Sequence, residues 1–236
     1  MTASIGVICL DTSFTKIPGH IRNTATFDFP VVYHVVAGMT PERVVTHPDP
    51  RILEPFITAA AELERAGVSA ITSACGFLAL FQRELAAAVA VPVYSSSLMQ
   101  VPLVHRMLRP GQAVGVLTAS STSLSPDYLK AVGGGSVPVR IAGMEDQPEF
   151  CEVILEGRRD DLNPARLGHE VLSQAEALKR ENPEIGALVL ECTDLVPFAS
   201  AIQERLGVPV FDIVTLTGLV HASLSRSPFT AAAEAG

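Results

Sequence analysis

A short pattern that occurs twice constrains the fold of this 236-residue chain more than any other feature. One apolar run ends at Cys75, and a second one ends at Cys192. Each cysteine is followed 17 residues later by the proline of a Val-Pro-Val sequence, and further on by Leu-Val-His, which begins at Leu103 and again at Leu219. Because three features recur in the same order with almost equal spacings, the sequence predicts an internal duplication that puts a cysteine at the same place in each half.

The hydrophobic pattern predicts an α/β fold. Short, continuous apolar runs at residues 5–10 and 113–118 are typical of strands buried on both faces of a parallel sheet. Such strand patterns alternate with helical patterns along the chain. We therefore expect two similar α/β lobes with mainly parallel sheets, related by a pseudo-two-fold axis. Residues 1–111 and 112–236 are the predicted lobes, so each holds one repeated cysteine, and the last helix is free to pack on the first lobe.

Turn residues mark the expected helix boundaries. Proline after a capping residue predicts helix starts at residues 48–50 and at Asn163-Pro164. Helical periodicity predicts further helices at residues 78–89 and 197–206, shortly after each repeated cysteine. Each cysteine is therefore expected where a strand ends and a helix begins.

A long irregular connection runs from residue 13 to residue 50. Pro18-Gly19 marks a turn in it, and residues 31–36 have the composition of a strand. Long connections of this kind either close over a site or add an edge strand to a sheet. The sequence leaves these two interpretations open.

Composition narrows the range of functions. A net charge of −8 disfavours nucleic acid and anionic membrane surfaces as partners. We see neither a secretory signal pattern nor a run of about 18 apolar residues, and expect a cytoplasmic protein that does not bind membranes. The four cysteines form no C-x-x-C pair, and the six histidines show no metal-ligand spacing. The sequence therefore predicts free thiols and no metal site.

The repeated cysteines suggest acid/base chemistry. In open α/β sheets, ligands bind at the carboxyl edge of the strands, where Cys75 and Cys192 are both expected. A helix N-terminus lowers a thiol pKa, so each sulfur is a candidate thiolate. Two lobes that face each other would place these sulfurs on opposite sides of one cleft. One thiolate and one thiol could then remove a proton from one face of a carbon and return one to the other face, which is racemisation or epimerisation.

Four short motifs support this interpretation. They are Asp11-Thr12 after the first strand, Ser73-Ala74-Cys75-Gly76, the hydroxyl-rich stretch from Thr118 to Thr122, and Glu191-Cys192-Thr193-Asp194. In these motifs the chain resembles the aspartate/glutamate racemase superfamily, which also includes hydantoin racemases, maleate isomerases and arylmalonate decarboxylases. The resemblance covers nearly the whole chain.

The resemblance implies specific roles. Proton transfer would be carried out by the two cysteines without a cofactor, on a small carboxylate or amino-acid-like substrate, and the chain would form a homodimer or a larger homo-oligomer. Asp11 and Thr12 would lie beside the substrate. The substrate carboxylate would be held by hydroxyl groups, those of Thr118, Ser120, Ser121, Thr122 and Thr193.

The chain also departs from the pattern of its relatives. Amino-acid racemases of the superfamily have Asn-Thr where this chain has Gly76-Phe77, and glutamate racemases have His where it has Asp194. All three positions lie within two residues of a cysteine and are candidate substrate contacts. Phe77 indicates a more apolar pocket, which disfavours glutamate as the substrate. The presence of both cysteines argues against the decarboxylases, which keep only one.

Simpler interpretations compete at several positions. Cys9 and Cys151 are expected to be small core residues. Asp194 either caps the following helix or orients the site, and Asp11 either forms a turn or contacts substrate. The overall prediction is a cofactor-independent racemase or epimerase. The alternatives are a hydantoin-type racemase, a maleate-type cis–trans isomerase, and a two-lobed protein that binds an acid without transforming it.

Overall fold

The computed structural model describes residues 3–46 and 52–226. Its strands form two four-stranded sheets in which every neighbouring pair is parallel. The helix start predicted at residues 48–50 falls outside the described residues, and helix α1 spans Leu53–Arg65. Within the described residues, no helix combines the length and the apolar composition needed to cross a bilayer.

The two sheets have the same strand order. The first has the order β2-β1-β3-β4 and the second β6-β5-β7-β8. The strands of the first sheet are β1 (Ile5–Leu10), β2 (Val31–Val36), β3 (Ala70–Ser73) and β4 (Val93–Tyr94). Those of the second are β5 (Ala113–Thr118), β6 (Val139–Gly143), β7 (Ile185–Leu190) and β8 (Val210–Phe211). Every residue of β1 and β5 is buried, and the predicted α/β fold of two similar parallel-sheet lobes is confirmed.

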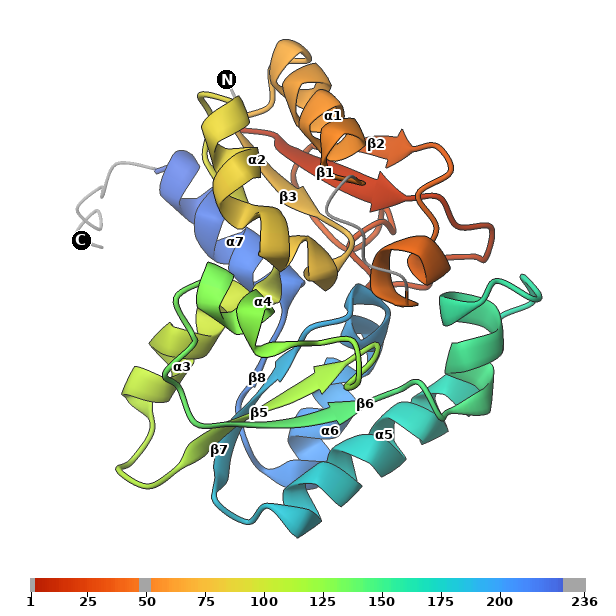
Figure 1. The fold of residues 1–236 in the computed structure, drawn as a ribbon, viewed down its shortest axis with the longest axis vertical. Coiled ribbons are helices and arrows are strands. Elements are labelled where there is room, and N and C mark those ends of the chain that lie inside the picture. Colours follow the sequence, from red (N-terminus) through yellow and green to blue (C-terminus); the bar gives the residue numbers. More distant parts are fainter. Residues whose placement is uncertain (1–2, 47–51, 227–236) are drawn as a thin grey trace, which may run out of the picture.

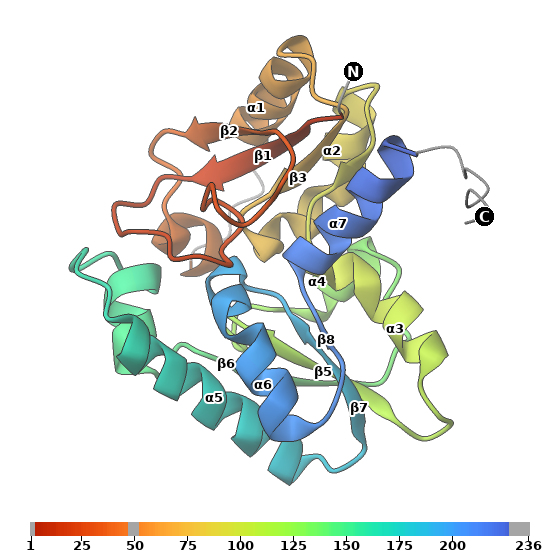
Figure 2. The ribbon, with the colours of Figure 1, turned by 180° about the vertical axis from the view of Figure 1, so that it is seen from behind.

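Helices cover both faces of the first sheet. Helices α1 and α2 (Gln82–Ala88) lie on one face, and α7 (Ile213–Leu224) lies on the other (Figures 1 and 2). Ile213 and Leu216 of α7 belong to the same buried cluster as Ile5 and Val7 of β1. The C-terminal part of the chain thus returns to the first sheet.

The second sheet is covered in a similar way. Helices α5 (Pro164–Glu181) and α6 (Ala199–Leu206) pack against each other and on the sheet, and α3 (Val101–Met107) packs on β5. Helix α5 begins where predicted, because the Oδ1 of Asn163 accepts hydrogen bonds from the N–H groups of Ala165 and Arg166. Helix α4 (Pro126–Ala131) packs across the lobe boundary on the segment that follows Cys75.

The helices after the two cysteines begin differently from the prediction. Each cysteine is followed by a 3-10 helix, η3 (Gly76–Phe81) or η6 (Thr193–Phe198), and the α-helices α2 and α6 begin only after these. In η6, Pro197 has no N–H and cannot donate the α-helical hydrogen bond at its position. The cysteines therefore precede short, tight turns instead of long α-helices.

The long connection between β1 and α1 contributes an edge strand and a short helical segment. Residues 31–36 form β2, which pairs in parallel with β1 at the edge of the first sheet. Residues 42–46 form a short helical segment, η1 (Glu42–Thr46), that contacts η5 (Phe150–Leu155) of the second lobe. The part before β2 folds back toward the carboxyl ends of the strands, where it joins the site described below.

The core should respond strongly to loss of a large side chain. Phe56 of α1 is fully buried, whereas Leu103 of α3 is 54% exposed. We expect Phe56→Ala to lower the free energy of unfolding by about 3–5 kcal/mol, because it removes apolar contacts and leaves a cavity. Leu103→Ala is the matched control and should change it by about 0.5 kcal/mol or less. Urea unfolding measures both, and equal losses in the two variants would contradict this packing.

Candidate active site

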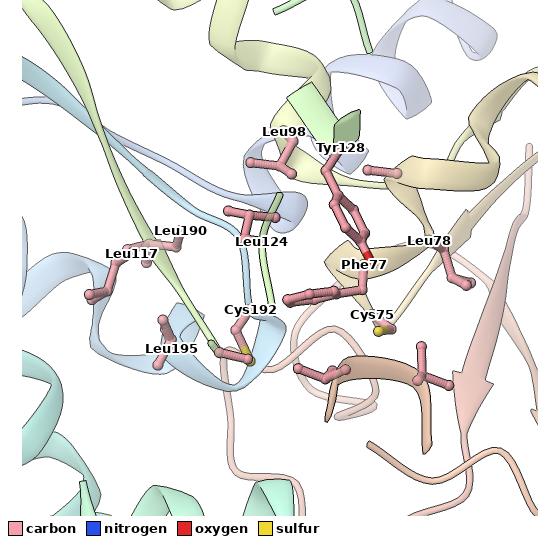
Figure 3. Close-up of a cluster of buried hydrophobic side chains, with 14 of the residues drawn as sticks. Cys75, Phe77, Leu78, Leu98, Leu117, Leu124, Tyr128, Leu190, Cys192 and Leu195 are labelled. Carbon is pink, nitrogen blue, oxygen red and sulfur yellow. The ribbon is translucent and has the colours of Figure 1, made fainter. Parts of the chain in front are cut away.

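The two repeated cysteines occupy equivalent positions. Cys75 follows β3 by one intervening residue and precedes η3, and Cys192 follows β7 in the same way and precedes η6. Both side chains are buried, and both contribute to the wall of one cavity at the carboxyl edges of the two sheets. Figure 3 shows the two sulfurs on separate segments with Phe77 close by. The duplicated fold therefore brings both thiols to one space.

The cavity is small and lies between the lobes. Its free volume is about 40 Å³, enough for a few water molecules. Apolar groups make up much of its wall, namely those of Leu10, Pro41, Val45, Ala74, Phe77, Ala119, Ile154 and Leu155. A larger outer groove of about 290 Å³ runs between residues 11–14, 40–42 and 153–157, and shares Thr12, Pro41, Ile154 and Leu155 with the cavity wall. The groove and the cavity are therefore adjacent.

Three basic side chains from the connection before β2 line the cavity: Lys16, His20 and Arg22. The Arg22 Nη1 donates hydrogen bonds to the carbonyl oxygen of Leu10, at 3.0 Å, and to the Thr12 Oγ1, at 2.8 Å. Within the described part of the chain, its other guanidinium nitrogens make no hydrogen bond. They are free to bind an anion in the cavity.

A buried charge cluster surrounds Asp194. The Lys16 Nζ lies 3.2 Å from its Oδ1, and the His20 Nε2 lies 3.3 Å from the same atom. Burial alone would raise the pKa of Asp194, but Lys16 and His20 outweigh this effect and hold the pKa well below its usual range. Burial also lowers the pKa of His20 and that of Lys16, although Asp194 opposes both shifts. Asp194 is therefore ionised and paired.

The thiols are more weakly acidic than the sequence indicated. Burial raises the pKa of Cys75 and of Cys192 far above the ordinary thiol value. The next cause is a nearby carboxylate, Glu191 for Cys75 and Asp194 for Cys192. The Cys192 Sγ itself donates to the Asp194 Oδ2 at 3.8 Å. The predicted lowering of both thiol pKa values is wrong, because backbone N–H groups of short 3-10 helices do not offset burial beside carboxylates.

A second acidic residue, Glu191, lies in the same wall. Its Oε2 accepts hydrogen bonds from the Thr118 Oγ1, at 2.7 Å, and from the Ala119 N–H, at 3.2 Å. Burial raises the pKa of Glu191 to about 7, although these two hydrogen bonds act in the opposite direction. Its Oε1 lies against Gly76, where a Cβ would overlap both this oxygen and the backbone carbonyl of Glu191. This close approach explains why residue 76 is a glycine.

The structure brings some of the predicted site residues to the cavity and not others. On its wall are Thr12, Cys75, Gly76, Phe77, Cys192, Thr193 and Asp194. Asp11 lines the outer groove, where its carboxylate accepts a hydrogen bond from the Gly38 N–H. The hydroxyl groups predicted to bind a carboxylate have partners within the protein, and Thr118, Ser120, Ser121 and Thr122 lie off the wall.

Four residues of the wall with ionisable side chains were not predicted as site residues: Lys16, His20, Arg22 and Glu191. The first three lie in an irregular connection with no motif, so their sequence positions carried no signal. Glu191 directly precedes a cysteine, and a buried acid at that place could have been recognised from the apolar run before it. Among the described residues, no group of three or more His, Cys, Asp or Glu side chains could hold a metal ion.

The fold and the site define a two-lobed α/β protein with a pair of cysteines at one cavity, and comparison with known proteins gives its family. The family model for Asp/Glu/hydantoin racemases matches residues 55–217. The chain therefore belongs to this family, and it is an enzyme of the Asp/Glu racemase superfamily. The family acts on small carboxylate substrates.

Two relatives have a different named activity. A dimethylsulfoniopropionate lyase of Durusdinium sp. clade D is 32% identical over 219 residues, which are 90% of this chain and 72% of the relative. Dimethylsulfoniopropionate lyase 3 of Emiliania huxleyi (strain CCMP1516) is 31% identical over 236 residues, which are 95% of this chain and 61% of the relative. The chain thus spans less than two thirds of the length of the second relative.

Solved structures share the fold at lower identity. Unliganded arylmalonate decarboxylase has a TM-score of 0.62 and is 14% identical, with 98% of this chain and 96% of that chain covered. Allantoin racemase from Pseudomonas fluorescens has a TM-score of 0.60 and is 22% identical, with 95% and 91% covered. These similarities place the chain in the fold of the racemases.

The raised thiol pKa values can be tested by alkylation. We expect iodoacetamide to modify Cys75 and Cys192 slowly at pH 7, because burial and neighbouring carboxylates keep both sulfurs protonated. The alkylation rate at each cysteine should rise with pH in proportion to the thiolate fraction, by up to about tenfold per pH unit. It should not level off by pH 9. Mass spectrometry of labelled peptides measures each site, with urea-unfolded protein as the control for access. A plateau below pH 8 would contradict the raised pKa values.

Proposed function

We propose that this chain is a cofactor-independent lyase that removes the α-proton of a small carboxylate and expels a group from the β-carbon. Dimethylsulfoniopropionate is the proposed substrate. The observation that carries the proposal is one cavity in which two cysteines meet basic side chains and apolar walls. The two lyases that match over 90% or more of this chain support the substrate.

The reaction requires one base. The base is the thiolate of one cysteine, which is a minor form at neutral pH because burial raises the thiol pKa. It takes a proton from C2 of the substrate, and the electrons of that C–H bond form the C2–C3 double bond. The C3–S bond breaks, and dimethyl sulfide leaves with the bonding electron pair. The products are acrylate, dimethyl sulfide and a protonated thiol, which returns its proton to water. Since dimethyl sulfide leaves as a neutral molecule, its departure needs no acid.

The cavity wall, together with the outer groove that adjoins it, suits the two ends of such a substrate. Arg22 and Lys16 would hold the carboxylate, because charge-assisted hydrogen bonds are the stronger class and planar guanidinium groups match carboxylates. The same contacts stabilise the negative charge that spreads onto the carboxylate as the α-proton leaves. Phe77, Ile154 and Leu155 provide apolar surface for the S-methyl groups.

Racemisation or epimerisation of a small carboxylate is the second candidate. It is favoured by the presence of two cysteines, since a two-base reaction uses a thiolate on one face of the carbon and a thiol on the other. Both candidates begin with loss of the α-proton. They differ in whether the second sulfur must return a proton.

Proton NMR in heavy water separates the two candidates. With dimethylsulfoniopropionate, we expect the signals of acrylate and dimethyl sulfide to appear. They should be abolished in the variant that lacks the cysteine acting as base and only reduced in the variant that lacks the other cysteine. Comparison of Cys75→Ala with Cys192→Ala therefore identifies the base. Cys151→Ala is the matched control and should retain activity. The racemase would be favoured instead if the wild type formed no acrylate but exchanged the α-proton of amino acids or hydantoins for deuterium, and if both variants lost this exchange.

The carboxylate contact makes a further prediction. Arg22→Met should raise the KM for dimethylsulfoniopropionate about 30-fold or more, because it removes a charged partner within a largely buried site. Arg109→Met, which alters an exposed arginine shortly after α3, is the control and should leave the KM unchanged. Steady-state assays of acrylate formation give both values. An unchanged KM in the Arg22 variant would place the carboxylate elsewhere.

A further inference from the structure

Glu191 is the one cavity acid that the proposed chemistry leaves without a role. Asp194 already has two basic neighbours, Lys16 and His20. Glu191 differs, because the hydrogen bonds to its Oε2 come from a hydroxyl group and a backbone N–H. Within the described residues, no lysine, arginine or histidine lies within ion-pair distance of it.

An isolated buried carboxylate is unfavourable unless a cation or a proton joins it. Removing an ionised carboxylate from water is costly, and above the pKa of the group only a partner of opposite charge offsets this cost. Glu191 is 1% exposed and yet belongs to the cavity wall. A ligand in the cavity is the partner that the fold itself does not supply.

The position of Glu191 fits that of a ligand contact. Its Oε2 is held by Thr118 and Ala119, while its Oε1 lies beside Gly76 and makes no hydrogen bond within the described residues. Arg22 and Lys16 lie in the same wall but belong to the first lobe, whereas Glu191 follows β7 of the second. The cavity thus offers basic groups from one lobe and an unpaired acid from the other.

We propose that Glu191 is the counter-ion for the cationic group of a zwitterionic substrate and selects such carboxylates over carboxylates of the same shape that lack the cationic group. The inference rests on the proposed function and names its substrate class: a small carboxylate with an onium centre on its β-carbon. The onium group would lie beside Glu191 and Phe77, and the carboxylate beside Arg22. Glu191 is a specificity-determining residue in this arrangement, and the sulfurs remain the proton-transfer groups.

Other charged and titratable groups face Glu191. They are Cys75 before η3, Cys192 and Asp194 around η6, Tyr128 of α4, and the basic side chains of Lys16, His20 and Arg22. Burial raises the pKa of the two thiols and of Tyr128, so they stay neutral between pH 6 and 8. Asp194 stays ionised over this range, because Lys16 and His20 hold its pKa well below the usual value, and burial lowers the pKa of His20.

Binding of a cation should therefore depend on pH through Glu191. The carboxyl group has a pKa of about 7 in the empty cavity, so below this pH a cation must displace its proton. Affinity for the zwitterion should rise between pH 6 and 8, by at most tenfold per unit for one linked proton. A carboxylate without a cationic group should show no such rise.

Two probes of equal shape test the proposal. N,N-dimethyl-β-alanine is cationic at its nitrogen over this pH range, and 4-methylpentanoate carries a carbon in its place. Isothermal titration calorimetry at pH 6 and 8 gives their affinities for the wild type and for Glu191→Gln, which keeps the shape of the side chain. Glu145→Gln is the matched control, since Glu145 binds Ser121 off the cavity wall.

We expect the wild type and the control to prefer the zwitterion, and Glu191→Gln to lose about 30-fold or more in affinity for it. The variant should still bind 4-methylpentanoate, which shows that its cavity is intact, and should show no rise with pH. A preference that persists in Glu191→Gln would overturn the proposal and assign cation binding to Phe77. A wild type that binds neither probe, or both equally, would also overturn it.

Turnover separates this inference from the proposed function. If the wild type prefers the zwitterion but forms no acrylate from dimethylsulfoniopropionate, the lyase proposal fails and the role of Glu191 stands. If acrylate forms and Glu191→Gln keeps the preference, the lyase proposal stands and the role of Glu191 fails.

Discussion

A largely buried ion pair between the lobes is the contact on which the site depends. The Lys16 Nζ, from the connection before β2, lies 3.2 Å from the Oδ1 of Asp194 in η6. Neither charge could remain buried alone, because an uncompensated charge in the interior is strongly destabilising. Thr193 adds neutral links across the same boundary, since its Oγ1 donates to the Ala74 carbonyl and lies 3.1 Å from the His20 Nε2. Closure of the lobes and ionisation of Asp194 are therefore coupled.

The fold could be predicted from the sequence because its signals are local. Apolar runs, helix-capping residues and turn prolines each depend on a few neighbouring residues, and the duplication doubled the evidence for them. The meeting of Cys75 and Cys192 at one cavity followed from the same logic, since equivalent strand ends of two matched lobes can face one space. The 3-10 geometry of η3 and η6 did not follow, because it depends on how each segment packs after its cysteine.

The polar site was much harder to predict. Lys16 and Arg22 reach the cavity through an irregular connection, so only tertiary packing reveals their position. The hydroxyl-rich stretch from Thr118 to Thr122 was misleading for a different reason. Its composition is that of a carboxylate-binding loop, but its hydroxyl groups bind carboxylates of the protein itself, since Thr118 donates to Glu191 and Ser121 donates to Glu145. The thiol pKa values depend on burial and on carboxylates brought close by folding, which no local pattern records.

The site is less symmetric than the fold that carries it. The basic groups come from the first lobe and both acids come from the second, so the two thiols have different surroundings. Cys192 donates to an ionised carboxylate at Asp194, whereas Glu191 is the principal charged neighbour of Cys75. Racemisation runs in both directions between mirror-image substrates and benefits from two sulfurs that can exchange roles. An elimination with a neutral leaving group runs in one direction and needs a single base, so unequal thiols are no disadvantage to it. The unequal charges around two matched cysteines are thus easier to reconcile with elimination than with racemisation.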